Sequence, residues 1–537
     1  MSLQLKQLSS LARVFPNKIY GKVENSITAV KGSTISYQIA YKGEGSYTFK
    51  IKSKLKEHII VYDVKYVPSS MPAYPQCDDG KYQNREPGLF PDPLIIKKRK
   101  QIKAESTYKA LWISIDVPCD LAKGTYDIDI IFTGDAEYKT TKKIKVEDVT
   151  LKNKEIIFTQ WFHVDCIANF HKVEVYSDKH WELIRKYMTL ATKHGIKMIL
   201  VPVLTPPLDT YEGGERTTTQ LVDIEVKNGE YVFDFSRLHT YIDIARECGI
   251  KYFEINHMFT QWGARYAPKV IATVNGEKKR IFGWETSATS DEYATFLRAL
   301  IPALIKELKA LGIPNDHVFF HVSDEPNNRC IDEYRGASAI LKPLVSGYKI
   351  TDALSHIEFF KQGLVEVSVC SIRCIEPFLE ENISDLWGYY CCAENMEVSN
   401  RFFGMSSERN RIIGTQIYKF GLKGFLHWGY NFYNTQLSRK QINPYKVTDA
   451  GGAFPSGDAF SVYPYKDGAM PSLRLKVFKE ALDDVSLLYM LEEKIGKEQT
   501  VALLEEVAKQ EITFKKYPLR EEFFASLRKK IISKLTK

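Results

Sequence analysis

The chain has 537 residues, of which 44% are hydrophobic and 26% charged, and its formal net charge is +8. This length exceeds that of one ordinary core and indicates a globular protein with at least two domains, one of them large. The excess of Lys and Arg is spread along the chain, and the densest run, Lys97–Lys100, is too short to predict a nucleic-acid surface.

The compartment is predicted from the cysteines and from the absence of long apolar runs. No stretch of about 18 apolar residues occurs, and the first residues lack the apolar core of a signal peptide. The nine cysteines are odd in number and lack zinc-like spacing, so they predict neither a disulfide framework nor a structural metal. We expect a cytoplasmic protein without membrane contact, or a secreted one if a signal peptide was removed from a longer precursor.

Up to about residue 150, short runs rich in Val, Ile, Thr and Tyr alternate with turn residues, a pattern typical of β-strands. The predicted strands include Ile27–Tyr41, Tyr47–Lys52, His58–Val67, Leu111–Val117 and Thr125–Phe132. The segment Ser69–Pro93 is dense in Pro, Gly and Asp and is expected to be a long loop. Residues 1–150 are therefore predicted to form a β-sandwich, and they contain no recognisable catalytic cluster.

From about residue 155, strands alternate with helices. The eight predicted strands are Ile156–Phe162, Lys197–Val203, Tyr252–His257, Val318–Ser323, Lys349–Leu354, Val365–Val369, Leu386–Cys391 and Gly424–Asn431. Helices are expected after most of them, for example at Lys179–His194, Ser236–Cys248, Ser290–Leu311 and Ser407–Phe420. Gly195, Gly249 and Gly312 are placed as C-terminal caps of three of these helices. Eight such units predict an α/β fold, a TIM (β/α)₈ barrel, over residues 151–495. A doubly wound sheet is disfavoured because no G-x-G-x-x-G motif follows the first strand.

The active sites of such barrels lie at the carboxyl ends of the strands, where this chain has many polar and aromatic residues. The residues predicted there to bind substrate are His163, Asp165, Asn256, His257, His321, Trp428, Asn431, Tyr433 and Asp458. The long segment Tyr433–Pro471 is expected to form part of the pocket wall. After it, Ser472–Leu491 has an apolar stripe that predicts a helix packed on the barrel. Residues 496–537 are predicted to be a solvated helical cap.

The strongest chemical signal is a pair of neighbouring carboxylates, Asp324 and Glu325. An apolar strand runs directly into Ser-Asp-Glu-Pro, which places the pair at the barrel mouth. Retaining glycosidases with two catalytic carboxylates hold them ~5–5.5 Å apart, usually on different strands. Adjacent residues, with Cα atoms ~3.8 Å apart, suit a mechanism in which the 2-acetamido group of the substrate is the nucleophile. Asp324 would then orient that group, and Glu325 would protonate the leaving oxygen.

Four segments resemble glycoside hydrolase family 123: HVSDEP at 321–326, GFLHWGYNFY at 424–433, GGAFPSGDAFSVYP at 451–464 and PSLRLKVFKEALDDVSLL at 471–488. The resemblance implies an N-terminal β-sandwich, a C-terminal TIM barrel, and a retaining, exo-acting β-N-acetylgalactosaminidase of the hexosaminidase type. Such an enzyme releases GalNAc from glycans or glycolipid oligosaccharides. Carried over to this sequence, the family's Asp-Glu pair becomes Asp324, which stabilises the acetamido group, and Glu325, the acid/base.

Three alternatives remain open. A two-carboxylate retaining β-glycosidase would use Glu325 as the acid/base and Glu394 as the nucleophile. A barrel that only binds glycans belongs to another class, but a binding groove gains nothing from two adjacent like charges. Metal catalysis has the least support, because His321 and Asp324 lack an H-E-x-x-H motif or a comparable ligand set. The sequence therefore predicts no metal, no cofactor, and a carbohydrate with terminal β-GalNAc as the partner. The sugar epimer, the linkage and the oligomeric state stay open.

Overall fold

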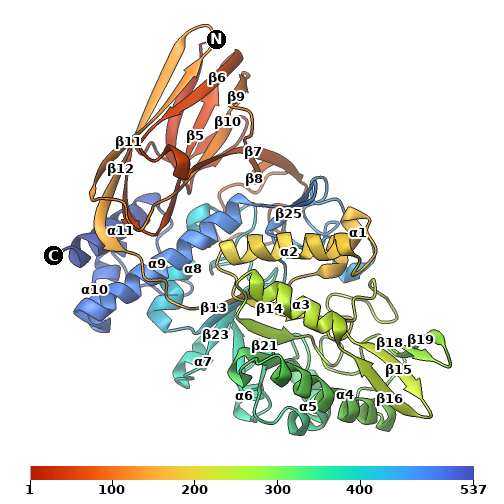
Figure 1. Ribbon diagram of the computed structural model, residues 1–537. Helices are drawn as coiled ribbons and strands as arrows, with labels where there is room; N and C mark the ends of the chain where they lie inside the picture. Colours follow the sequence, from red (N-terminus) through yellow and green to blue (C-terminus); the bar gives the residue numbers. More distant parts are fainter. Residues whose placement is uncertain (1) are drawn as a thin grey trace.

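The computed structural model describes residues 2–537, and its N-terminal part is two five-stranded β-sheets packed face to face (Figure 1). The first sheet has the order β1 (Gln4–Ser9), β5 (Thr34–Lys42), β10 (Lys109–Asp116), β7 (Ile59–Ser69) and β8 (Gly88–Ile96). The second has the order β4 (Ser26–Lys31), β12 (Glu137–Thr150), β11 (Gly124–Thr133), β6 (Gly45–Lys52) and β9 (Gln101–Ala104). A buried apolar cluster that includes Ile39, Phe49, Leu111 and Phe132 fills the space between them. The predicted β-sandwich is confirmed.

Two details of the sandwich differ from the sequence prediction. The single predicted strand Ile27–Tyr41 is two strands, β4 and β5, which belong to different sheets. Gly32 adopts a φ of +72° between them, a conformation that favours glycine and lets the chain pass from one sheet to the other. The predicted loop Ser69–Pro93 is shorter than expected because β8 already begins at Gly88.

The second part of the chain is a closed barrel of eight parallel strands, as predicted. In order around the barrel they are β13 (Ile157–Gln160), β14 (Met198–Val201), β17 (Tyr252–Ile255), β20 (Val318–Phe320), β21 (Lys349–Leu354), β22 (Val367–Ser371), β23 (Trp387–Tyr389) and β24 (Gly424–His427). The barrel closes where β13 pairs with β24, with Ile157 opposite Gly424. Apolar side chains including Met198, Phe319 and Trp387 fill its interior, as in other TIM barrels.

Helices follow most of the barrel strands. They are α1 (Val164–His171), α2 (Asp178–Lys193), α3 (Ser236–Glu247), α4 (Asp291–Ala310), α5 (Ile331–Leu344), α6 (Glu358–Lys361), α7 (Glu376–Glu380), α8 (Ser407–Phe420) and α9 (Leu473–Ile495). The three predicted glycine caps are present, with φ values of +91°, +92° and +67° at Gly195, Gly249 and Gly312. None of the helices within residues 2–537 combines the length and the apolar composition that crossing a bilayer requires.

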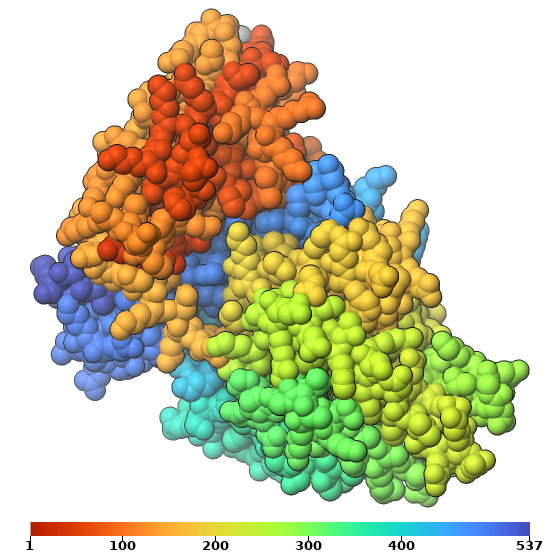
Figure 2. All heavy atoms as spheres, in the orientation of Figure 1, coloured from red at the N-terminus to blue at the C-terminus, as the bar shows by residue number. Residues whose placement is uncertain are grey.

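Three small sheets were not predicted. One has the order β16 (Glu230–Asp234), β15 (Asp223–Lys227), β18 (Val270–Val274) and β19 (Glu277–Phe282), and the others pair β2 (Arg13–Val14) with β3 (Ile19–Tyr20) and β25 (Val462–Tyr465) with β26 (Gly468–Pro471). The four-stranded sheet is built from the connections that follow β14 and β17, and it projects from the barrel in Figures 1 and 2. The β25–β26 hairpin occupies the end of the long segment that follows β24, so this segment is partly regular structure.

The C-terminal helix α11 (Glu521–Leu535) lies beside the sandwich strands β4 and β12, and α10 (Lys497–Ala508) packs on α9 and α11 (Figure 1). One apolar cluster unites residues of the sandwich, of α9 and of these two helices, including Trp112, Leu488, Leu504, Phe523 and Ile531. The C-terminal region is therefore not the solvated cap that its Lys-rich sequence suggested. Its apolar face joins the sandwich to the barrel.

The loop between β7 and β8, residues 70–87, also leaves the sandwich and packs on the barrel. The Tyr74 hydroxyl donates to the Ala453 carbonyl at 3.1 Å. The Asp79 carboxylate forms a buried ion pair with Arg409, at 2.7 Å. The sandwich thereby contacts the long segment that follows β24, at the end of the barrel where active sites lie.

Candidate active site

The carboxyl ends of the barrel strands surround a cavity of about 220 Å³. The residues that line it are Trp161, Leu208, Asp209, Trp262, Asp324, Glu325, Ala353, Tyr389, Cys391, Cys392, Leu426, Trp428, Gln436 and Phe454. Pockets for larger ligands have volumes of ~300–1,000 Å³. The cavity therefore has room for one small polar molecule, and any larger ligand must extend beyond it.

Asp324 and Glu325 lie side by side in the cavity wall, at the turn that follows β20. Glu325 has a φ of +41°, an uncommon value for a residue other than glycine. Two hydrogen bonds fasten this turn to the loop after β17: the Ser323 hydroxyl donates to the Thr260 carbonyl at 2.8 Å, and the Trp262 N–H donates to the Asp324 carbonyl at 2.8 Å. Strained backbone held by several contacts is common at catalytic sites.

The two carboxyl groups differ in their partners. One oxygen of Glu325 accepts a hydrogen bond from the Tyr389 hydroxyl at 2.7 Å. The Asp324 carboxyl receives no hydrogen bond from any residue in the range 2–537. Burial, and then the charge of Glu325, raises the pKa of Asp324 well above its usual value. Burial also raises the pKa of Glu325, although the Tyr389 hydrogen bond opposes it. A ligand that donates to Asp324 would favour its ionised form and leave the remaining proton on Glu325.

A buried histidine, His321, lies between two carboxylates shortly before the Asp324–Glu325 pair. His321 is hydrogen-bonded through Nδ1 to Asp352 at 2.8 Å and through Nε2 to Glu254 at 2.7 Å. Burial alone would lower the pKa of His321, but these two carboxylates outweigh it and raise the pKa to about 10. Asp352 also accepts from the backbone N–H groups of Val322 and Ser323, at 3.1 and 3.2 Å. This network fixes the backbone from which Asp324 projects.

The same region holds three potential metal ligands within 4.8 Å of one another: His257, His321 and Asp352. Both ring nitrogens of His321 already bond carboxylates, so neither has a lone pair free for a metal ion. The His257 ring is stacked on His321, with centroids 4.3 Å apart, and burial lowers its pKa well below the usual value. The donor set therefore fits a protonated His321 between two carboxylates better than it fits a metal ion.

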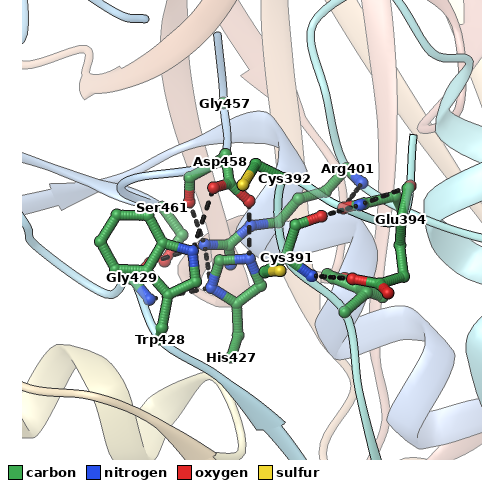
Figure 3. A network of polar contacts seen from close by, with 12 residues as sticks. Cys391, Cys392, Glu394, Arg401, His427, Trp428, Gly429, Gly457, Asp458 and Ser461 are labelled. Carbon is green, nitrogen blue, oxygen red and sulfur yellow. Dashed lines mark hydrogen bonds and ion pairs between the residues drawn. The ribbon is translucent and has the colours of Figure 1, made fainter. Parts of the chain in front are cut away.

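A second buried network supports the opposite wall (Figure 3). The indole N–H of Trp428 donates to Asp458 at 3.0 Å, which fixes the indole that lines the cavity. Arg401 donates to His427 Nδ1 at 2.9 Å and to the Asp458 carbonyl at 3.0 Å. Because His427 Nδ1 accepts, its proton lies on Nε2, which is 3.4 Å from the Asp458 carboxylate. Burial raises the pKa of Asp458 to about 7, although the charge of Arg401 opposes the shift.

Of the predicted site residues, only Asp324, Glu325 and Trp428 line the cavity. The other eight, all buried, are His163, Asp165, Asn256, His257, His321, Asn431, Tyr433 and Asp458. All of these except His257 hydrogen-bond protein partners: Asp165 pairs with Arg216 at 2.7 Å, and Tyr433 donates to a carbonyl at 3.1 Å. We therefore reassign the seven hydrogen-bonded residues from substrate contact to support of the cavity wall, and His257, which stacks on His321, does not line the cavity either.

Several lining residues were missed by the sequence analysis. Tyr389 stands at the end of β23, so the strand-end rule that selected the other residues could have found it. Asp209 and Trp262 lie in loops, where no periodic pattern marks them, whereas Gln436 and Phe454 belong to the segment Tyr433–Pro471 that was expected to form part of the pocket wall. Asp209 is a third carboxyl group on the wall, and burial raises its pKa to about 6.

Glu394, the nucleophile of the two-carboxylate alternative, does not line the cavity. It is 1% exposed, and its oxygens accept from the Ser371 hydroxyl at 2.5 Å and from the Cys391 N–H at 2.8 Å. Figure 3 shows it on the far side of Cys391 from Trp428. A nucleophile needs a free oxygen directed at the substrate, so this geometry argues against that mechanism.

The model of one protein family, glycoside hydrolase 123 catalytic domain, matches residues 161–491, which is more than half of the chain. The chain belongs to glycoside hydrolase family 123. The matched range starts at Trp161, beside the first barrel strand, and includes every residue that lines the cavity. The family resemblance read from the sequence motifs is confirmed. The protein is a glycoside hydrolase, and its substrate is a carbohydrate.

A solved structure of a family 123 glycoside hydrolase from Clostridium perfringens, described in terms of glycolipid glycan hydrolysis, resembles this family member along its whole length. The match covers 100% of this chain and 97% of that chain, with a TM-score of 0.73 and 14% sequence identity. At this identity the likeness shows the shared fold. A β-D-glucuronidase from Dictyoglomus thermophilum (TM-score 0.32, 9% identity, 90% and 97% covered) is too distant to carry an argument. The same holds for a family 2 β-galacturonidase from Eisenbergiella tayi (TM-score 0.32, 11% identity, 90% and 72% covered). No curated protein matches the sequence.

Proposed function

We propose that this glycoside hydrolase is a retaining, exo-acting β-N-acetylgalactosaminidase that uses the 2-acetamido group of its substrate as the nucleophile. The observation that carries the proposal is the unsatisfied carboxyl of Asp324, which lies beside Glu325 in the cavity wall and has no donor among residues 2–537. A substrate amide N–H supplies such a donor. A plain hydroxyl sugar can also donate, but it cannot attack its own anomeric carbon.

In the first step, the acetamido oxygen attacks the anomeric carbon as the glycosidic bond breaks, and Glu325 gives its proton to the leaving oxygen. Asp324 accepts a hydrogen bond from the acetamido N–H and balances the positive charge of the resulting oxazolinium ion. In the second step, the Glu325 carboxylate takes a proton from water, which attacks the anomeric carbon and reopens the ring. Two inversions at the same carbon retain the β configuration.

The proposed substrate is a glycan or glycolipid oligosaccharide with a terminal β-linked GalNAc. A cavity of about 220 Å³ suits a single terminal sugar and therefore exo-cleavage. The wall combines aromatic rings, such as Trp161 and Trp428, with carboxylates, which is the surface that an amphipathic pyranose ring requires. The Clostridium perfringens relative is described as hydrolysing glycolipid glycans. The nine free thiols are consistent with the cytoplasmic location that we propose.

The test compares p-nitrophenyl β-GalNAc, β-GlcNAc and β-galactoside under the same conditions. We expect the GalNAc substrate to be cleaved and the galactoside to be almost inert, because an intramolecular nucleophile contributes ~7–11 kcal/mol to lowering the barrier. A thiazoline analogue of GalNAc should inhibit far below the KM of the substrate.

A different substrate preference would contradict parts of this proposal. Efficient cleavage of the galactoside, together with indifference to the thiazoline, would overturn substrate assistance. Trapping with a 2-fluoro sugar would then identify the protein nucleophile, and labelling of Glu394 would restore the two-carboxylate mechanism. Preference for the GlcNAc substrate would keep the mechanism and change the sugar.

A further inference from the structure

Trp262 stands out among the aromatic residues of the cavity because it is 46% exposed, whereas Trp161 in the same wall is 2% exposed. Its indole has no ring or cation over it and its indole N–H has no acceptor within residues 2–537. Tyr211, another exposed aromatic residue, differs in having the Arg439 guanidinium 4.7 Å from its ring centroid. Trp262 therefore presents an apolar ring face and an indole N–H, neither of which has such a partner among residues 2–537, at the edge of the site.

The backbone around Trp262 has an unfavourable conformation. Trp262 and Ala264 have φ values of +59° and +54°, in the left-handed region that non-glycine residues rarely adopt. Between them, Gly263 donates to the Ser323 hydroxyl at 3.4 Å, and a Cβ on this glycine would come within 2.9 Å of Cys330 Cβ. A loop of this kind does not adopt such a conformation by local preference, so its contacts must impose it.

Those contacts join the loop to the catalytic turn. The Trp262 N–H bonds the Asp324 carbonyl, and the Gln261 side chain donates to the Thr210 carbonyl at 2.8 Å, beside the wall residue Asp209. The backbone of Trp262 is thus fixed relative to the Asp324–Glu325 pair.

We propose that Trp262 is the platform for the second sugar ring of the substrate, the one that leaves when the terminal GalNAc is released. This inference rests on the proposed function and extends it to the leaving group. The cavity holds one sugar, so the next ring must lie at its edge, where the half-exposed indole stands. The apolar face of that ring packs on the indole, and the indole N–H donates to one of its hydroxyl groups. The preferred substrate is therefore an oligosaccharide rather than a simple alkyl glycoside.

The test measures the variant-to-wild-type ratio of kcat/KM on two substrates, one without and one with a second sugar ring, so that differences in leaving-group basicity cancel. One is methyl β-GalNAc, and the other is a disaccharide in which β-GalNAc is linked to a second hexose. We expect Trp262→Ala to lower kcat/KM for the disaccharide about tenfold, equivalent to about 1.4 kcal/mol, beyond any loss on the methyl glycoside. The alanine keeps the backbone N–H that bonds Asp324. Trp262→Phe should recover most of the loss, because it keeps the stacking face and lacks only the N–H.

Leu89→Ala is the matched control, because Leu89 is an exposed apolar residue (50%) on β8 of the sandwich and should leave both substrates unaffected. The GalNAc thiazoline, which lacks the second ring, should lose less affinity for Trp262→Ala than the disaccharide loses in kcat/KM. An unchanged kcat/KM for the disaccharide, or equal losses on both substrates, would overturn the platform and leave the proposed function standing. A wild-type protein that cleaves no β-hexosaminide would overturn both.

Discussion

The hydrogen bond from Tyr389 to Glu325 affects the pH dependence of the enzyme, because it lowers the pKa of Glu325. Glu325 must be protonated to act as an acid, so kcat/KM falls as the pH rises through the pKa of this group in the free enzyme. Burial raises that pKa, whereas the hydroxyl of Tyr389 stabilises the ionised form and lowers it. Tyr389→Phe removes only the lowering contribution. The alkaline limb of the profile should therefore move to higher pH.

The size of the pKa shift expected in Tyr389→Phe follows from the energy of the hydrogen bond between Tyr389 and Glu325. A hydrogen bond to a charged group contributes about 1.5–3 kcal/mol. Since one pKa unit corresponds to about 1.36 kcal/mol, full loss of the bond gives a shift of about 1–2 units. Water that enters the space left by the hydroxyl replaces part of the interaction, so we expect about 1 unit. The neighbouring carboxyl of Asp324 makes this an apparent pKa of the pair rather than of Glu325 alone.

The assay is the profile of kcat/KM against pH on a glycoside with a poor leaving group, for which the acid is essential. Tyr390→Phe is the matched control, because Tyr390 is the next residue, is equally buried, and directs its hydroxyl to Asn410. That variant should leave the alkaline limb in place. An unmoved limb in Tyr389→Phe, or a shift to lower pH, would refute the assignment of Glu325 as the acid whose proton this bond controls.

Three further predictions concern the carboxylates. Glu325→Gln should nearly abolish hydrolysis of glycosides with poor leaving groups and impair activated aryl glycosides less, because acid assistance matters most for a basic leaving oxygen; equal losses would count against it. Asp324→Asn should lower kcat by roughly 10²–10⁴-fold without lowering the melting temperature, and near-normal turnover would show that Asp324 has no catalytic role. Asp352→Ala should lower the free energy of unfolding by about 3–5 kcal/mol in urea, because it breaks a buried ion pair with His321. An unchanged unfolding midpoint would contradict that.

The barrel was predictable because its strands are short buried runs that alternate with capped amphipathic helices. The position of the Asp324–Glu325 pair was predictable for a related reason, since the apolar run Val318–Phe320 leads straight to it and fixes which end of the barrel it occupies. The four-stranded sheet was not, because its strands at 223–234 and 270–282 are interrupted by a helix and by a barrel strand. Pairing between such distant segments leaves no local signature.

The substrate contacts were harder to predict because a polar side chain at a strand end has two possible partners, a ligand or another residue. Asp165 and His163 bond Arg216, which lies some fifty residues away in a loop that the sequence does not place. Asp458 likewise bonds Trp428 and leaves the indole, not the carboxylate, facing the cavity. Sequence patterns locate the end of the barrel where buried polar groups gather. The choice between wall and contact depends on loop conformations that only the folded chain determines.

The loop from the sandwich to the barrel connects the N-terminal domain to the wall of the cavity. Tyr74 holds the carbonyl of Ala453, and the next residue, Phe454, lines the cavity and packs edge-on against Trp428, with ring centroids 5.5 Å apart. Any displacement of this loop is transmitted to the sugar-binding wall through two covalently linked residues and one ring contact. We therefore expect the loss of the Tyr74 hydroxyl to disturb the cavity wall, although Tyr74 lies outside the catalytic domain that the family model delimits.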